Sequence, residues 1–133
     1  MTYFLDTNIC IYFLMGKYPN LLAKIMSYSP NDIKIPAIVK AELFHGAEKS
    51  IQRDDNINKI SAFLLPFEIV PFDEASAEYY GKIKAALEIN GKLIGPNDLL
   101  IAATALAKDA ILVTNNMSEF SRIDGLRLEN WIY

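Results

Sequence analysis

Thr2-Tyr3-Phe4-Leu5-Asp6-Thr7-Asn8 is the segment that decides the fold of this chain. The bulky residues from Tyr3 to Leu5 predict a short strand that is buried on both faces, as is typical of a parallel sheet. This strand ends abruptly at a carboxylate, Asp6. In an open parallel sheet, ligands bind in the crevice at the carboxyl ends of the strands. We therefore expect Asp6 to lie at the mouth of such a crevice.

Four later segments have the short apolar pattern of strands. They cover residues 33–35, 68–70, 111–113 and, as an edge strand, 126–131. Segments with helical spacing lie between them. Strands that alternate with helices indicate a parallel sheet covered on both faces. The sequence therefore predicts an α/β fold with a central, mostly parallel, twisted sheet of about five strands and helices on both faces.

Helix boundaries are predicted from caps and periodicity. Thr7 or Asn8 is expected to cap the helix that follows the first strand. Residues 50–55 are polar and are predicted to form a loop, and the next helix is expected over residues 56–67. Residues 37–49 are apolar around most of the helix axis, so this helix is expected to be buried on more than one side.

Length and composition predict one packed domain over residues 1–133, because 52% of the residues are hydrophobic. No apolar run approaches the roughly 20 residues of a membrane span, and no signal-peptide pattern opens the chain, so we expect a cytoplasmic protein. Cys10 is the only cysteine and His45 the only histidine. Any metal ion must therefore be held by oxygen atoms.

The charge balance bears on nucleic-acid binding. A formal net charge of -3 argues against a protein that holds long nucleic acid by bulk charge. A local basic rim could still bind the phosphates of a nucleic acid. The candidates for it are six cationic residues: Lys40, Lys49, Arg53, Lys82, Lys84 and Lys92. Charges on helices usually only face solvent, so none of the six is assigned individually.

Two carboxylates occupy unusual places in the predicted helices. Glu42 lies within an otherwise apolar helix, where it needs a partner, a cation or a solvent-filled cleft; alternatively it lies on one wetted stripe with Glu48 and Lys49. Asp98 lies in the first turn of a helix that begins at Pro96, where the helix dipole stabilises a carboxylate even without a ligand. The residues from Leu99 to Ala103 are wholly apolar, so this helix is expected to lie deep against the sheet.

A third polar cluster follows the strand predicted at 111–113. It runs from Thr114 through Asn116 to Glu119, and it also stands at a carboxyl end if the sheet is parallel. The alternative is an ordinary turn in which Asn116 caps a short helix and Glu119 is its capping-box partner.

Taken together, the polar positions suggest one chemistry. If Asp6, Glu42, Asp98 and the region of Glu119 converge, their carboxylates repel one another. The usual remedy is a hard divalent cation, Mg²⁺ or Mn²⁺, bound by oxygen atoms and water. Such an ion activates water for attack on a phosphodiester and stabilises charge on the phosphoryl oxygens.

The chain resembles PIN-domain ribonucleases of the VapC type, the toxin half of bacterial VapBC toxin–antitoxin pairs. The resemblance rests on successive motifs: Leu5-Asp6-Thr7-Asn8, Ala41-Glu42-Leu43 with Gly46, Gly95-Pro96-Asn97-Asp98 leading into Ile101-Ala102-Ala103, and Val113-Thr114-Asn115-Asn116-Met117-Ser118-Glu119-Phe120. The similarity continues to the closing segment from Leu126 to Trp131, and the order and spacing of the motifs together are specific.

The resemblance implies a three-layer PIN-like fold and a metal-dependent endoribonuclease that cuts RNA, commonly a tRNA. Asp6, Glu42 and Asp98 match the acids that bind Mg²⁺ or Mn²⁺ in the family. Many PIN domains have an aspartate where this chain has Asn116, which makes Glu119 the predicted fourth acid. The predicted supporting residues are Thr7, Asn8, Thr114 and Asn116. The implied partners are a small antitoxin that covers the active site and a second copy of the chain.

Two other interpretations remain open. A phosphoaspartyl hydrolase would also begin with Leu5-Asp6-Thr7 and use Asp6 as its nucleophile, but a second aspartate is commonly wanted where this chain has Asn8. The other alternative is a PIN-like binding module without catalysis, in which the acids only cap helices and a partner protein is the real ligand.

Overall fold

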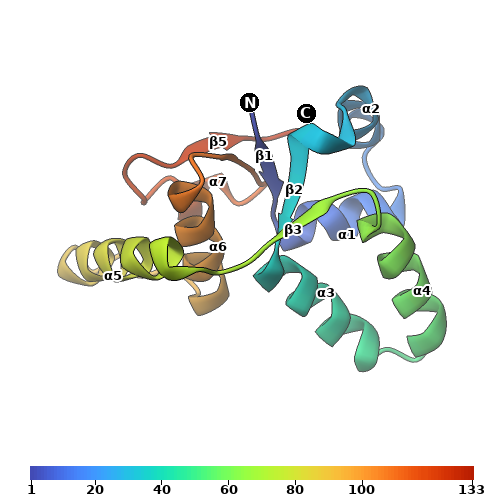
Figure 1. The fold of residues 1–133 in the computed structure, drawn as a ribbon, viewed down its shortest axis with the longest axis horizontal. Helices are drawn as coiled ribbons and strands as arrows, with labels where there is room; N and C mark the ends of the chain where they lie inside the picture. Colours follow the sequence, from blue (N-terminus) through green and yellow to red (C-terminus); the bar gives the residue numbers. More distant parts are fainter.

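The computed structural model describes residues 1–133, and its centre is a sheet of five parallel strands (Figure 1). The strands are β1 (Tyr3–Leu5), β2 (Ile33–Pro36), β3 (Glu68–Val70), β4 (Ile111–Val113) and β5 (Arg127–Glu129). They lie in the order β3-β2-β1-β4-β5, and every neighbouring pair is parallel. The predicted parallel sheet with an edge strand near the end of the chain is therefore confirmed.

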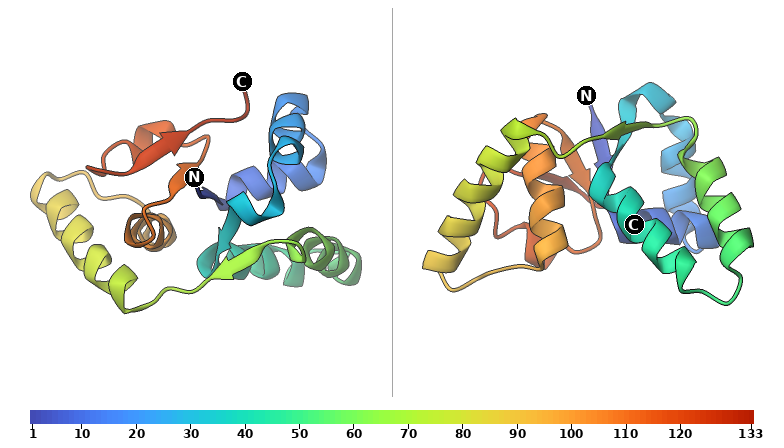
Figure 2. Two further views of the ribbon diagram at one scale, coloured as in Figure 1. Left: turned by 45° about the horizontal axis from the view of Figure 1, so that its top comes forward. Right: turned by 60° about the horizontal axis from the view of Figure 1, so that its bottom comes forward.

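The helices form a layer on each side of the sheet. The chain passes from β1 through β2 to β3 in one direction and then returns to β4 and β5. Because parallel crossovers are right-handed, this reversal moves the helices to the other face. One face carries α1 (Thr7–Met15), α2 (Pro19–Ser27), α3 (Ala37–Glu48) and α4 (Arg53–Leu64); the other carries α5 (Glu74–Ile89), α6 (Pro96–Ala107) and α7 (Met117–Phe120) (Figures 1 and 2).

The core confirms the expectation for β1 and α6. All three residues of β1 are buried, and Leu5 is wholly inaccessible. Helix α6 lies between the sheet and α5, which explains why residues 101–105 are buried without interruption. A cluster of 29 buried residues joins both helical layers to the sheet. No helix here combines the length and the apolar character that a membrane span requires.

Some predicted helix boundaries are wrong. The residue that caps α1 is Asp6, not Thr7 or Asn8: its Oδ1 accepts a hydrogen bond from the Ile9 N–H at 2.9 Å. Helix α4 begins at Arg53, inside the segment predicted as a loop, and ends at Leu64. The acidic residues Asp54 and Asp55 lie in its first turn, where the helix dipole favours negative charge, so polarity there indicated a helix start.

Helix α3 is buried less completely than expected. Its buried residues Val39, Leu43 and Ala47 lie four positions apart and form a single strip, while Ala41 and His45 are exposed. Small apolar residues alone therefore did not indicate burial on more than one side. The strip is flanked by half-buried residues, and Glu42 is one of them.

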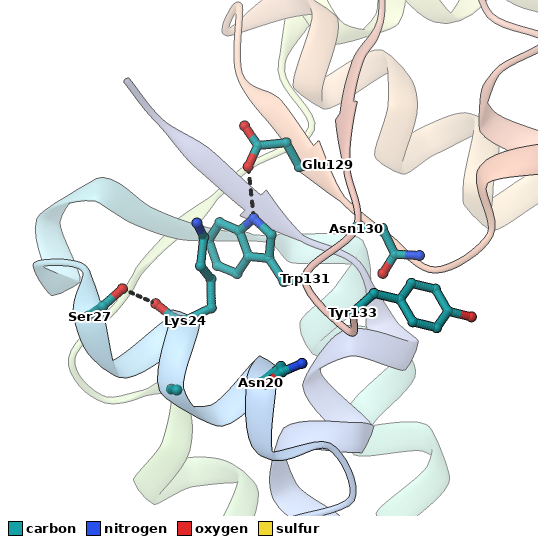
Figure 3. A pocket seen from close by; sticks show the side chains of 8 residues that line it. Asn20, Lys24, Ser27, Glu129, Asn130, Trp131 and Tyr133 are labelled. Carbon is teal, nitrogen blue, oxygen red and sulfur yellow. Dashed lines mark hydrogen bonds between the residues drawn. The ribbon is translucent and has the colours of Figure 1, made fainter.

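The end of the chain is attached to α2 by an aromatic cluster. Trp131 stacks on Tyr28 with ring centroids 5.1 Å apart, and it lies equally close to Tyr3. Its Nε1 donates a hydrogen bond to Glu129, and Lys24 extends over the indole (Figure 3). A hollow of about 460 Å³ remains beside this cluster, and none of the predicted acids lines it. Trp131 is therefore a core residue.

Candidate active site

Three of the predicted acids line one small pocket at the carboxyl ends of the central strands. Asp6 follows β1, Glu42 comes from α3, and Asp98 lies in the first turn of α6. The pocket has a volume of about 220 Å³, and its other lining residues are Thr7, Asn8, Asn116 and Phe120. It lies where the strand order reverses, between β1 and β4, which is the place where open α/β sheets bind ligands.

Asp6 is held in place by two donors. Its Oδ1 accepts the Ile9 N–H, and its Oδ2 accepts the hydroxyl of Thr114, which follows β4 and is itself fully buried. Burial raises the pKa of Asp6 to about 6, although the bonds from Thr114 and Ile9 pull the pKa down. Both carboxylate oxygens are thus engaged, which disfavours Asp6 as the nucleophile of a phosphoaspartyl hydrolase.

Glu42 joins the two helical layers. Its Oε1 accepts the hydroxyl of Thr7 at 2.5 Å, and its Oε2 accepts the amide of Asn97 at 3.3 Å. Thr7 begins α1 and Asn97 lies in the first turn of α6. The interpretation in which Glu42 only lies on a wetted stripe with Glu48 and Lys49 is therefore wrong. Asn97 was not among the predicted supporting residues, although it immediately precedes Asp98.

Asp98 and Glu119 are coupled carboxyl groups, and each shifts the pKa of the other. Burial, followed by the hydrogen bond and charge of Glu119, raises the pKa of Asp98 to about 7. Burial also disfavours the charged form of Glu119, but hydrogen bonds outweigh it and lower the pKa of that carboxyl. When the two carboxyl groups hold a single proton, these shifts favour Asp98 over Glu119 as its site.

The partners of Glu119 exclude the capping-box interpretation. Its Oε1 accepts the N–H of Gly95 at 2.9 Å, and its Oε2 accepts the side-chain amide of Asn116. Asn116 precedes α7 but makes no side-chain cap, and its own N–H is donated to Thr114. Asn116 thus acts as a hydrogen-bond donor here. Glu119 fastens the connector before α6 and does not line the acid pocket.

The donor set suits a hydrated divalent cation. No three histidine, cysteine, aspartate or glutamate side chains lie close enough together to form a ready chelate. Mg²⁺ usually keeps several water molecules and binds through one or two carboxylates, so it does not need a closed protein cage. The pocket offers only oxygen ligands, because Cys10 is buried in the core and His45 is exposed. Burial is the largest cause of the raised pKa of Asp98, and the charges of the neighbouring carboxylates add to it; a cation would relieve that repulsion.

The structure is thus a doubly wound parallel sheet with a cluster of acids at its switch point. The family model described as the PIN domain matches residues 3–126, and the chain belongs to this family. It is 46% identical to "Ribonuclease VapC2" of Rickettsia felis, over 98% of each chain. It is 36% identical to "tRNA(fMet)-specific endonuclease VapC" of Shigella flexneri, again over 98% of each.

Solved structures give the same result. The VapC-type chain in the complex of VapBC2 from Rickettsia felis with a DNA fragment from its promoter superposes with a TM-score of 0.93 at 43% identity, covering 98% of this chain and 99% of that one. The structure of FitAcB from Neisseria gonorrhoeae superposes with a TM-score of 0.85 at 28% identity, covering 97% of each chain. The predicted fold and the resemblance to the VapC type are confirmed.

Proposed function

We propose that this protein is a Mg²⁺- or Mn²⁺-dependent endoribonuclease, the toxin of a toxin–antitoxin pair, and that its substrate is a tRNA. The observation that carries the proposal is the convergence of Asp6, Glu42 and Asp98 on one pocket at the switch point of the sheet. Relatives named as a ribonuclease and as a tRNA endonuclease, each aligned over nearly the whole chain, support it. We therefore expect this protein to act in the cytoplasm, where both RNA and an antitoxin that binds its own promoter would be present.

The residues of the pocket have separate roles. Asp6, Glu42 and Asp98 would hold the cation, which when bound lowers the pKa of water and stabilises charge on the phosphoryl oxygens. Thr114 fixes the carboxylate of Asp6 by a hydrogen bond. The net reaction breaks the bond between phosphorus and the leaving sugar oxygen and adds the elements of water across it. We infer that the chain itself contributes position and charge rather than a covalent nucleophile.

Two further residues orient the acids from outside. Thr7 aims the carboxylate of Glu42 by donating its hydroxyl. Glu119 acts indirectly as the fourth acid. It accepts the Gly95 N–H, and this contact sets where α6 begins and therefore where Asp98 lies. In this role Glu119 tunes the site without being a direct ligand, and its loss should weaken activity less than loss of Asp6 or Asp98.

We propose that the antitoxin binds in a hollow next to Glu42. A mainly apolar hollow of about 440 Å³ lies between α1, α3 and α4, and Glu42 lines one end of it. Ile11 and Met15 extend into solvent there, with Met15 66% exposed. An apolar segment of the antitoxin would fill this hollow, and an arginine from the same segment would meet the carboxylates. Two solved relatives are VapBC complexes bound to DNA. The homodimer stays a prediction.

The test is cleavage of a tRNA pool by the purified chain with Mg²⁺ and with EDTA. We expect cleavage only with the cation, and none from Asp98→Asn. The matched control is Asp54→Asn, which removes a carboxylate from the exposed side of α4 and should cut at the wild-type rate. Equal cutting by Asp98→Asn, or cutting that resists EDTA, would overturn the proposal. A binding module without catalysis would show no coupling between Mg²⁺ and the carboxylates in a metal titration.

A further inference from the structure

A large polar hollow lies beside the acid pocket, between the end of α5 and α7. Its volume is about 730 Å³, and its polar lining comes from Asn90, Lys92, Ser118, Ser121 and Arg122. Two of these residues are cations, and no carboxylate belongs to the lining. A surface of this kind suits an anion, in contrast to the acid pocket.

The cations of this hollow are not occupied by ion pairs. The chain has three arginines, and two of them are paired with carboxylates: Arg53 with Glu48 and Asp54, and Arg127 with Asp109. Arg122 forms no ion pair. Its Nη1 donates only to the Leu93 carbonyl, at 3.3 Å, which leaves most of its donors free. Lys92 is likewise outside every ion pair of the structure.

Residues of the hollow are close in sequence to both partners of one contact, that between Glu119 and the Gly95 N–H. Ser118 directly precedes Glu119, and Lys92 lies three residues before Gly95. Arg122 is near enough to Glu119 that its charge helps to lower the pKa of that carboxyl. The segment around α7 lines both sites: residues 116 and 120 line the acid pocket, and residues 118, 121 and 122 line the hollow. An RNA strand bound along this segment would therefore meet both sites.

A polyanionic substrate needs such a site. The chain has a formal net charge of -3, and the acid pocket itself repels the phosphates that flank the one being cut. We propose that Arg122 and Lys92, with the hydroxyls of Ser118 and Ser121, bind the phosphate backbone of the RNA strand next to the cleaved bond. This inference rests on the proposed ribonuclease function and names the residues that hold its substrate. Since these groups contact phosphate and sugar, they add affinity without reading sequence.

The experiment measures RNA binding as a function of salt. In an Asp98→Asn background, which should bind but not cut, Arg122→Gln is expected to weaken binding of single-stranded RNA about tenfold and to reduce the slope of log Kd against log salt by about 0.7. Arg122→Lys should keep most of the slope. The matched control is Arg127→Gln, which removes the same group at the amino end of β5. The acids lie at the carboxyl ends of the strands, away from this position. It should leave both quantities unchanged.

Kinetics in the otherwise unaltered chain separate binding from a structural effect. Arg122→Gln and Lys92→Gln should raise KM several-fold with little change in kcat. If Arg122→Gln binds RNA with the same affinity and salt slope as Arg127→Gln, the backbone site is overturned while ribonuclease activity stands. A fall in kcat at unchanged KM would also overturn it, because Arg122 would then act through Leu93 and Glu119. Failure of the unaltered chain to cut RNA at all would remove the proposed function itself.

Discussion

The four predicted acids fall into two pairs that are held in different ways. Asp6 and Glu42, the first pair, each accept a hydroxyl from a threonine on another element. Asp98 and Glu119, the second pair, shift each other's pKa in opposite directions, and only Glu119 accepts hydrogen bonds from other groups, the Gly95 N–H and the Asn116 amide. The first pair is arranged before any ligand arrives. In the second pair, a bound cation would take the place of a proton.

This difference assigns separate tasks to the two pairs. The threonine hydroxyls stay neutral across the working pH range and orient these two side chains without a cation, so the geometry of the first pair should depend little on whether a cation is present. In the second pair the cation and the proton compete for the same oxygens, so metal affinity should rise as the proton is lost. The two pairs therefore respond differently to the same substitutions, and the predictions below use that contrast.

The largest effect is expected when a charge of either pair is removed inside the pocket. Asp6→Asn and Asp98→Asn should each lower the cleavage rate more than about 100-fold, beyond the range that outer contacts usually give. Stability should separate the two variants: in EDTA at pH 8, Asp98→Asn should raise the Tm because it removes repulsion from Glu119, whereas Asp6→Asn should not. Thermal melts measure this. Equal Tm changes in both variants would show that the two pairs do not differ.

The second prediction concerns pH in metal-free buffer. The pKa values of Asp6 and Asp98 are raised from the ordinary 3.8 to about 6 and about 7, so their stabilising contribution is full below about pH 4 and is lost as pH rises through these values. The Tm in EDTA should therefore fall between pH 5 and pH 8. The lowered pKa values of Asp73 and Glu119 act below this window.

The same melts contain their own controls. Asp98→Asn should flatten the decline between pH 6 and pH 8, and saturating Mg²⁺ should restore the Tm of the unaltered chain at pH 8, because binding to the folded state alone stabilises it. A Tm in EDTA that rises steadily over this range would mean that neither carboxylate is held protonated.

The third prediction concerns Glu119→Gln, a substitution outside the pocket that weakens the second pair. Glu119→Gln keeps an oxygen that can accept the Gly95 N–H but loses the charge, so cleavage should fall by about tenfold and recover in part at higher Mg²⁺. The readout is the Mg²⁺ dependence of the rate for Glu119→Gln and the unaltered chain. Full activity at low Mg²⁺ would leave Glu119 as a purely structural fastener of the connector.

The acids could be located from the sequence because each one follows a feature with a known place in a parallel sheet. Asp6 ends a buried strand, and Asp98 starts an apolar helix that can only lie against the sheet. What could not be predicted is which donor meets which oxygen. Thr114 lies 108 residues from Asp6 in the chain, and Asn97 lies 55 residues from Glu42, so no local pattern records either contact.

Local competition explains the other errors. The sequence offers Asp6, Thr7 and Asn8 as successive capping residues, and the one that caps α1 is decided by where β1 ends in the sheet. Glu119 and Asn116 have the spacing of a capping box, but the unpaired N–H of Gly95 attracts the carboxylate across 24 residues of chain. In the first case the sheet decides which of three local caps is used, and in the second a tertiary contact takes the place of a local one.

The smallest expected effect is on the first pair and comes from Thr7. Thr7→Val has nearly the same shape but cannot donate to Glu42, which keeps Asn97 as its other partner at the longer distance of 3.3 Å. Because one donor remains, Glu42 should become less well oriented rather than displaced, and cleavage should fall by only about threefold to tenfold. Thr7→Ser retains the hydroxyl and should cut at nearly the wild-type rate, which separates the hydrogen bond from the packing of the methyl group. Added Mg²⁺ should not rescue Thr7→Val as it rescues Glu119→Gln, since the lost contact orients a carboxylate without changing its charge. If Mg²⁺ rescues both variants equally, the first pair is no more preorganised than the second.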